Sequence, residues 1–100
     1  MKIYPTGLYE AENNSWSVFI NVMDNRVVFH LYSCTYDDLV ELRDNFIGMI
    51  QPRKPWFTVL TDLTEFISND PSATYAVSDI QRLLVDHGVA EIARVNYQLP

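Results

Sequence analysis

Apolar and polar residues alternate along the first third of the chain. In Trp16–Met23 every second residue is apolar and points to one side, and the alternation resumes in Arg26–Ser33. A period of two indicates β-strands that bury one face. Asp24-Asn25 between them favours a tight turn. Gly7–Glu12 predicts a weaker strand before them, so this third is predicted to be an antiparallel meander.

The pattern changes to a helical period twice. From Thr35, a predicted N-cap, to about Ile50, apolar residues recur every three or four positions. A second helix is predicted with Asp70 as its N-cap and Pro71 at its first helical position. Its apolar stripe runs to Gly88, which suits the residue after a helix C-terminus.

The remaining apolar segments predict two more strands. Trp56–Leu63 is short and rich in β-formers, which favours a central strand, and Val89–Tyr97 follows the second helix. We therefore predict one α/β (α+β sandwich) domain over residues 1–100, with the order β-β-β-α-β-α-β. The sheet is mixed and both helices cover mainly one face. The open face is predicted to keep Phe19, His30, Tyr32, Trp56 and Arg94.

Charge and composition narrow the functional classes. Seven basic and thirteen acidic residues give a net charge of −6. This charge opposes binding to nucleic acids and to anionic membranes, which require basic patches. The chain has one cysteine, no signal peptide and no apolar run of about 18 residues, so we expect a cytoplasmic protein.

Candidate catalytic and metal-binding groups are few. The histidines and the cysteine lack metal-ligand spacing, and no glycine-rich phosphate loop is present, so we expect neither metal nor cofactor. His30 and Cys34 lie about 13 Å apart along a strand, too far for a nucleophile and its base. Asp62 is expected to end a strand and Asp70 to cap a helix. An enzyme would need a cleft that joins Asp62, His30 and Cys34.

Three short motifs mark the ends of elements in the second half. They are Lys54-Pro55-Trp56 before the central strand, Asp62 at its end and His87-Gly88 at the end of the second helix. In these positions residues 54–95 resemble the SpoIIAA-like branch of the STAS group, and the element order resembles it over about residues 16–97. Members commonly continue with another helix, which implies either a short domain or a sequence that lacks its C-terminal helix.

The resemblance also implies a regulatory loop. Anti-sigma factor antagonists of this group carry Asp-Leu-Ser, five residues and then Asp-Ser-Ser-Gly. Here Asp62-Leu63-Thr64 is followed by five residues and Asp70-Pro71-Ser72-Ala73. Ser72 falls on the phosphorylated serine of the family, although proline and alanine replace the first serine and the glycine. The implied switch and docking loop comprises Asp62, Thr64, Asp70 and Ser72.

We predict a non-enzymatic, regulatory protein-interaction module that binds another protein or a second copy of itself. The candidate surfaces are the loop, the helix face with Tyr75, Asp79 and Arg82, and the open sheet face with Phe19 and Tyr32. Two alternatives stay open. A carrier of a small apolar ligand or lipid would need a closed apolar pocket of at least about 300 Å³ between helices and sheet. A phospho-switch antagonist would act through Ser72.

Overall fold

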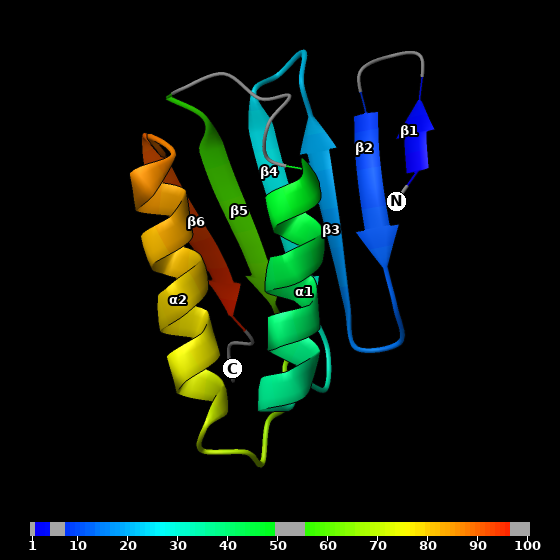
Figure 1. Cartoon of the computed structure of the whole chain (residues 1–100), viewed down its shortest axis with the longest axis vertical. Coiled ribbons are helices and arrows are strands. Elements are labelled where there is room, and N and C mark those ends of the chain that lie inside the picture. Colours follow the sequence, from blue (N-terminus) through cyan, green and yellow to red (C-terminus); the bar gives the residue numbers. More distant parts are fainter. Residues whose placement is uncertain (1, 5–7, 50–55, 97–100) are drawn as a thin grey trace.

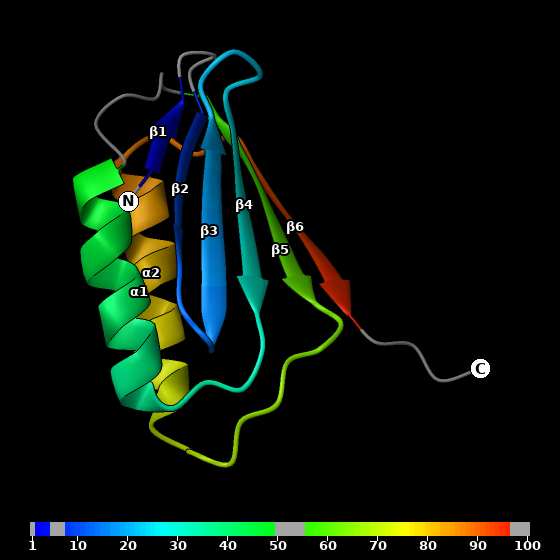
Figure 2. The same ribbon diagram turned by 90° about the vertical axis from the view of Figure 1, so that its right-hand side faces the viewer.

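A computed structural model describes residues 2–4, 8–49 and 56–96, which form one sheet covered on one side by two helices (Figures 1 and 2). In chain order the elements are β1 (Lys2–Tyr4), β2 (Leu8–Glu12), β3 (Trp16–Asn21), β4 (Arg26–Leu31), α1 (Tyr36–Met49), β5 (Thr58–Leu63), α2 (Ala73–Asp86) and β6 (Glu91–Asn96).

The strands lie side by side in the order of the sequence. β1 to β4 form an antiparallel meander, and β4, β5 and β6 run parallel. The two parallel pairs require crossover connections, and α1 and α2 supply them. The predicted order β-β-β-α-β-α-β and the one-sided helix layer are confirmed (Figure 2). The sequence did not predict β1, because three residues are too few to show an alternation.

The register assigns each residue of the meander to one face. Val18 pairs with Phe29 on the helix side, and Phe19 pairs with Val28 on the other side. The apolar residues of β3 and β4 that face the helices are all buried. The connection between these strands is a four-residue turn, so β3 ends earlier than predicted and Met23 is exposed.

The first helix begins as its sequence predicts. The Oγ1 of Thr35 accepts a hydrogen bond from the amide of Asp38 at 3.3 Å, and the Asp38 carboxylate accepts one from the amide of Thr35 at 2.9 Å. This reciprocal pair is a capping box. On the buried side, the rings of Phe46 and Phe29 meet edge to face at 5.1 Å. The core face of α1 comprises Leu39, Leu42, Phe46 and Met49.

The central strand starts later than predicted. β5 begins at Thr58, and Trp56 has a positive φ of 64°, which no strand residue adopts. Its amide donates to the carbonyl of Gly88 at 2.8 Å, while its side chain is 79% exposed. The buried aromatic residue of this segment is Phe57 instead.

The second helix also starts two residues later than predicted. Ser72, not Asp70, is the N-cap, because Pro71 and Ser72 form a turn before the first helical residue, Ala73. The C-terminal prediction is confirmed: Gly88 follows the C-cap with φ 85°. Neither α1 nor α2 is long and apolar enough to cross a membrane.

Some predicted features fall outside the described residues. These are Gly7 at the start of the first predicted strand, Ile50 at the end of the first helix, Lys54-Pro55 of the entry motif, and the end of the chain from Tyr97 to Pro100.

Candidate functional site

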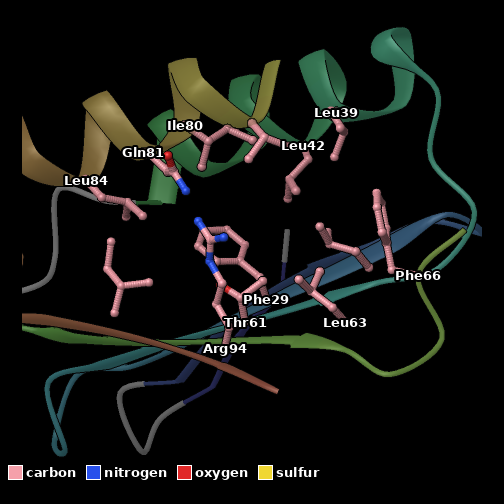
Figure 3. A pocket seen from close by; sticks show the side chains of 13 residues that line it. Phe29, Leu39, Leu42, Thr61, Leu63, Phe66, Ile80, Gln81, Leu84 and Arg94 are labelled. Carbon is pink, nitrogen blue, oxygen red and sulfur yellow. The ribbon is translucent and has the colours of Figure 1, made fainter. Parts of the chain in front are cut away.

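A cavity of about 230 Å³ lies between the helices and the sheet (Figure 3). The cavity lies where a ligand carrier would have its pocket. It is smaller than the predicted minimum of about 300 Å³ and is partly open instead of closed. Most of its wall is apolar. The residues that line it are Phe29, Leu31, Leu39, Leu42, Thr61, Leu63, Phe66, Val77, Ile80, Gln81, Leu84, Ile92 and Arg94.

The unequal packing of the two helices explains the cavity. α1 packs close to β2 and β3, whereas α2 packs on α1 and stays farther from every strand. Arg94 of β6 lines the space beneath α2, and its charged guanidinium does not fill this space as an apolar side chain would. The space beneath α2 is therefore left partly open.

Arg94 lies on the helix side of the sheet. It pairs with Thr61, which pairs with the buried Phe29, so the three residues share one face. The prediction that placed Arg94 on the open face was wrong. Ile92, two residues earlier, packs against the core, and a strand returns to the same face every second residue.

Two polar side chains of the cavity, those of Arg94 and Gln81, lie where it opens into the neighbouring groove. In Figure 3 the side chains of Arg94 from β6 and Gln81 from α2 point toward one another across the cavity. Within residues 8–49 and 56–95, neither side chain makes a hydrogen bond or an ion pair, and the cavity wall contains no carboxylate. Arg94 is exposed because β6 is the edge strand, so its guanidinium stands where the cavity meets solvent.

The cavity continues into a wider groove of about 610 Å³. Both are lined by Phe66, Val77, Gln81 and Arg94. From there the groove follows the predicted docking loop, whose residues 68–71 form part of its wall. The loop that the sequence singled out thus borders the cavity mouth.

Within this loop, Asp70 connects the beginnings of both helices. Its carboxylate accepts hydrogen bonds from the amide of Tyr36 at 2.8 Å and from the amide of Ser72 at 2.9 Å. These bonds favour the charged form, and they hold the pKa of Asp70 below its ordinary value. Asp70 therefore has a structural role, because its carboxylate satisfies an amide at the start of each helix although it lies three residues before the first residue of α2.

Asp62 closes a turn at the end of β5. Its carboxylate accepts from the amide of Thr64 at 3.0 Å and from the Thr64 hydroxyl at 2.7 Å. These two bonds lower the pKa of Asp62, and the nearby imidazole of His30 contributes a smaller decrease. The Nε2 of His30 lies 3.7 Å from Asp62 and 3.6 Å from Glu65.

Ser72 is exposed at the N-terminus of α2 and makes no side-chain capping bond. Helix N-terminal amides attract phosphate, but the Asp70 carboxylate already accepts the hydrogen bond from the Ser72 amide. A phosphate on Ser72 would be repelled by that carboxylate. Phosphorylation of Ser72 stays a prediction.

The open sheet face has an apolar centre. Phe19, Val28, Leu60 and Ala93 are successive cross-strand partners from β3 to β6, and none is buried. The neighbouring rows are mainly polar. They contain Asn21, Arg26, Thr58 and Glu91 on one side and Ser17, His30, Asp62 and Val95 on the other.

The predicted interaction residues fall on two surfaces. Phe19 belongs to the open sheet face, and so does Tyr32, whose ring lies 4.6 Å from that of His30. Tyr75 and Arg82 are exposed on α2, on the opposite side of the molecule (Figure 2). The third residue of this helix face, Asp79, pairs with Arg43 of α1 at 3.5 Å.

Of the three residues that an enzyme cleft would need to join, His30 and Asp62 lie 3.7 Å apart, whereas Cys34 is buried. Cys34 is buried and its Sγ donates to the carbonyl of Ser15 at 3.2 Å. Burial raises the pKa of this thiol, which disfavours the nucleophilic thiolate. His30 lies instead beside two carboxylates. Among the described residues, no group of three or more His, Cys, Asp or Glu side chains could hold a metal ion.

Comparison with known proteins identifies the architecture. No protein-family model matches the sequence, and no curated protein matches it. An uncharacterized DUF3478-family protein from Shewanella loihica PV-4, which has a SpoIIAA-like fold, matches 99% of this chain and 75% of its own, with a TM-score of 0.54 and 16% identity. The chain has a SpoIIAA-like fold.

A second structure of this similarity is that of a protein called Mglu. It has a TM-score of 0.56 and 16% identity and matches 86% of this chain. The chain spans 18% of the length of Mglu. At these identities the likeness concerns the SpoIIAA-like fold alone, and it confirms the fold implied by the motifs in the second half.

Sequence reasoning missed the two polar residues that line the cavity, Gln81 and Arg94. Gln81 interrupts the stripe of α2, four residues after Val77 and three before Leu84, so its helical position gave a usable signal. The inward position of Arg94 could have been read from Ile92. The cavity itself depends on the distance of α2 from the sheet, which no sequence pattern indicates.

Proposed function

We propose that this protein is a non-enzymatic interaction module whose open sheet face docks onto a protein partner. The observation that carries the proposal is the apolar row of Phe19, Val28, Leu60 and Ala93, which no helix covers. An apolar centre within a polar rim is the arrangement that protein interfaces use. The acidic net charge is compatible with a protein partner and opposes nucleic acid.

The SpoIIAA-like fold supports a module of this general type, and the partner is either another protein or a second copy of the chain. Sedimentation of the purified protein separates these two cases, because a second copy would produce a dimer at micromolar concentration.

The test uses capture from the cells of origin with three tagged proteins. They are the wild type, Leu60→Lys on the open face and Ile47→Lys, which replaces an exposed apolar residue of α1. We expect a partner retained by the wild type and by Ile47→Lys and lost with Leu60→Lys. Equal retention by all three would contradict the docking face.

A second candidate function is the binding of a small apolar ligand in the cavity beneath α2. The specific observation in its favour is the cavity of about 230 Å³ with a predominantly apolar wall. The cavity is smaller and more open than most ligand pockets, so it suits only a small ligand held by apolar contacts and a few placed polar groups. Mass spectrometry of solvent extracts from the purified protein tests it. We expect an amphiphile with the wild type that is absent with Val77→Trp, which fills the cavity.

A further inference from the structure

We infer that the cavity beneath α2 selects an amphiphile with one negative charge, an alkyl carboxylate of about eight carbons, and holds its head group on Arg94 and Gln81. This inference rests on the proposed ligand-binding function and adds the chemistry of the ligand. It concerns the helix side of the sheet, separate from the proposed docking face.

The polar groups of the cavity argue for an anion. The guanidinium of Arg94 has no carboxylate partner among the described residues, and it points toward the carboxamide of Gln81 (Figure 3). A guanidinium presents a planar set of donors that matches a carboxylate with two parallel hydrogen bonds. The amide of Gln81 supplies a further donor. A bound carboxylate would therefore satisfy both side chains.

The apolar wall argues for a tail of limited length. An engineered cavity of about 150 Å³ accommodates benzene, with six carbons, so about 230 Å³ accommodates about nine non-hydrogen atoms. Leu39, Leu42 and Ile80 offer the tail only hydrocarbon contacts (Figure 3). An eight-carbon chain fits, with its two oxygens at the mouth where Arg94 meets solvent.

The surrounding charge favours a carboxylate over a phosphate. The groove beside the mouth includes Asp70, and the chain carries a net charge of −6. A phosphate monoester carries about 1.5 to 2 negative charges at neutral pH and would meet stronger repulsion than a carboxylate. One guanidinium balances a single negative charge.

Calorimetric titration of the purified protein tests the inference with three probes that share an eight-carbon tail: octanoate, 1-octanol and octyl phosphate. We expect octanoate to bind at least about tenfold more tightly than octanol, the factor that one hydrogen bond to a charged group supplies. Octyl phosphate should bind less tightly than octanoate.

Two matched variants locate the head group. Arg94→Gln should reduce octanoate affinity about tenfold and leave octanol affinity within about twofold. Arg82→Gln removes an equal charge from the exposed side of α2, away from the cavity, and should leave both affinities unchanged. Circular dichroism of both variants verifies that they are folded.

The outcomes separate the two claims. If neither octanoate nor octanol binds, the ligand-binding function itself fails. If octanol binds as tightly as octanoate, or if Arg94→Gln and Arg82→Gln weaken octanoate equally, the cavity is a ligand site and the head-group inference is wrong. Tighter binding of octyl phosphate would overturn the choice of a carboxylate.

Discussion

Phe29 and Phe19 lie on neighbouring strands and face opposite sides of the sheet. Phe29 is buried, packs edge to face on Phe46 and lines the cavity, whereas Phe19 is partly exposed in a row that no helix covers. The same side chain therefore stabilises the fold on one face and is available for contacts on the other. Comparing the faces separates residues needed for folding from residues available for binding.

The largest expected effect is on stability. Phe29→Ala should lower the free energy of unfolding by about 3–5 kcal/mol, because it removes buried contacts and leaves a larger cavity. Phe19→Ala should lower it by about 1 kcal/mol or less, since it removes only cross-strand contacts on a half-exposed surface. Urea unfolding measures both. Equal losses would show that the open face is part of the core.

A charge placed inside the cavity tests the covered face. Gln81→Glu introduces a carboxylate that can pair with Arg94, so we expect at least a tenfold loss of octanoate affinity and a higher melting temperature. Glu41→Gln, which changes an exposed residue of α1, is the control. Unchanged octanoate binding in Gln81→Glu would place the ligand elsewhere.

The link between the two helix N-termini predicts a pH dependence. Hydrogen bonds from two amides lower the pKa of Asp70 in the folded protein. The charged Asp70 side chain therefore stabilises the fold fully at a pH above its unfolded pKa of about 3.9. This stabilisation is lost as the pH falls through the lower pKa of the folded state. Asp70→Asn should therefore melt at a lower temperature than wild type at pH 7, and the difference should shrink toward pH 2.

A charge-matched variant completes this experiment. Asp86→Asn removes an exposed carboxylate that has no hydrogen bond within the described residues. We expect a smaller change at pH 7 than for Asp70→Asn. A constant difference between Asp70→Asn and wild type from pH 7 to pH 2 would refute the structural role of the charge.

The smallest expected stability change concerns Ser72. Its side chain is exposed and makes no capping bond, so Ser72→Asp and Ser72→Ala should each shift the melting temperature by only a few degrees, about what a surface substitution produces. If Ser72 is a switch, Ser72→Asp should weaken capture of the partner and Ser72→Ala should not. Equal capture by both variants would exclude the switch.

The sequence predicted the elements better than their ends. Alternation in β3 and β4 assigned the faces of the meander correctly, and the Thr35 cap and Gly88 marked helix ends. The start of α2 was predicted two residues too early, because a proline such as Pro71 suits a turn before a helix as well as its first position. The start of β5 was also predicted two residues too early. The side chain of Trp56 is typical of a strand, but its positive φ is not.

The candidate site was predicted only in part. The docking loop borders the cavity, which the sequence did not indicate, and Asp70 within it bonds to the amide of Tyr36, 34 residues earlier in the chain, as well as to that of Ser72. Arg94 was assigned to the wrong face, which a one-residue error in a strand produces. The cavity depends on how far α2 stands from β5 and β6, a tertiary distance that local patterns do not encode.

The central claim is that the two faces of the sheet bind different things, with a small anion on the covered face only. Nuclear magnetic resonance of the isotope-labelled protein during titration with octanoate tests it most directly. We predict saturable shift changes at Phe66, Val77, Gln81 and Arg94, with Phe19, Val28 and Leu60 unchanged. Changes centred on Phe19, Val28 and Leu60, or no saturable change at all, would contradict the account.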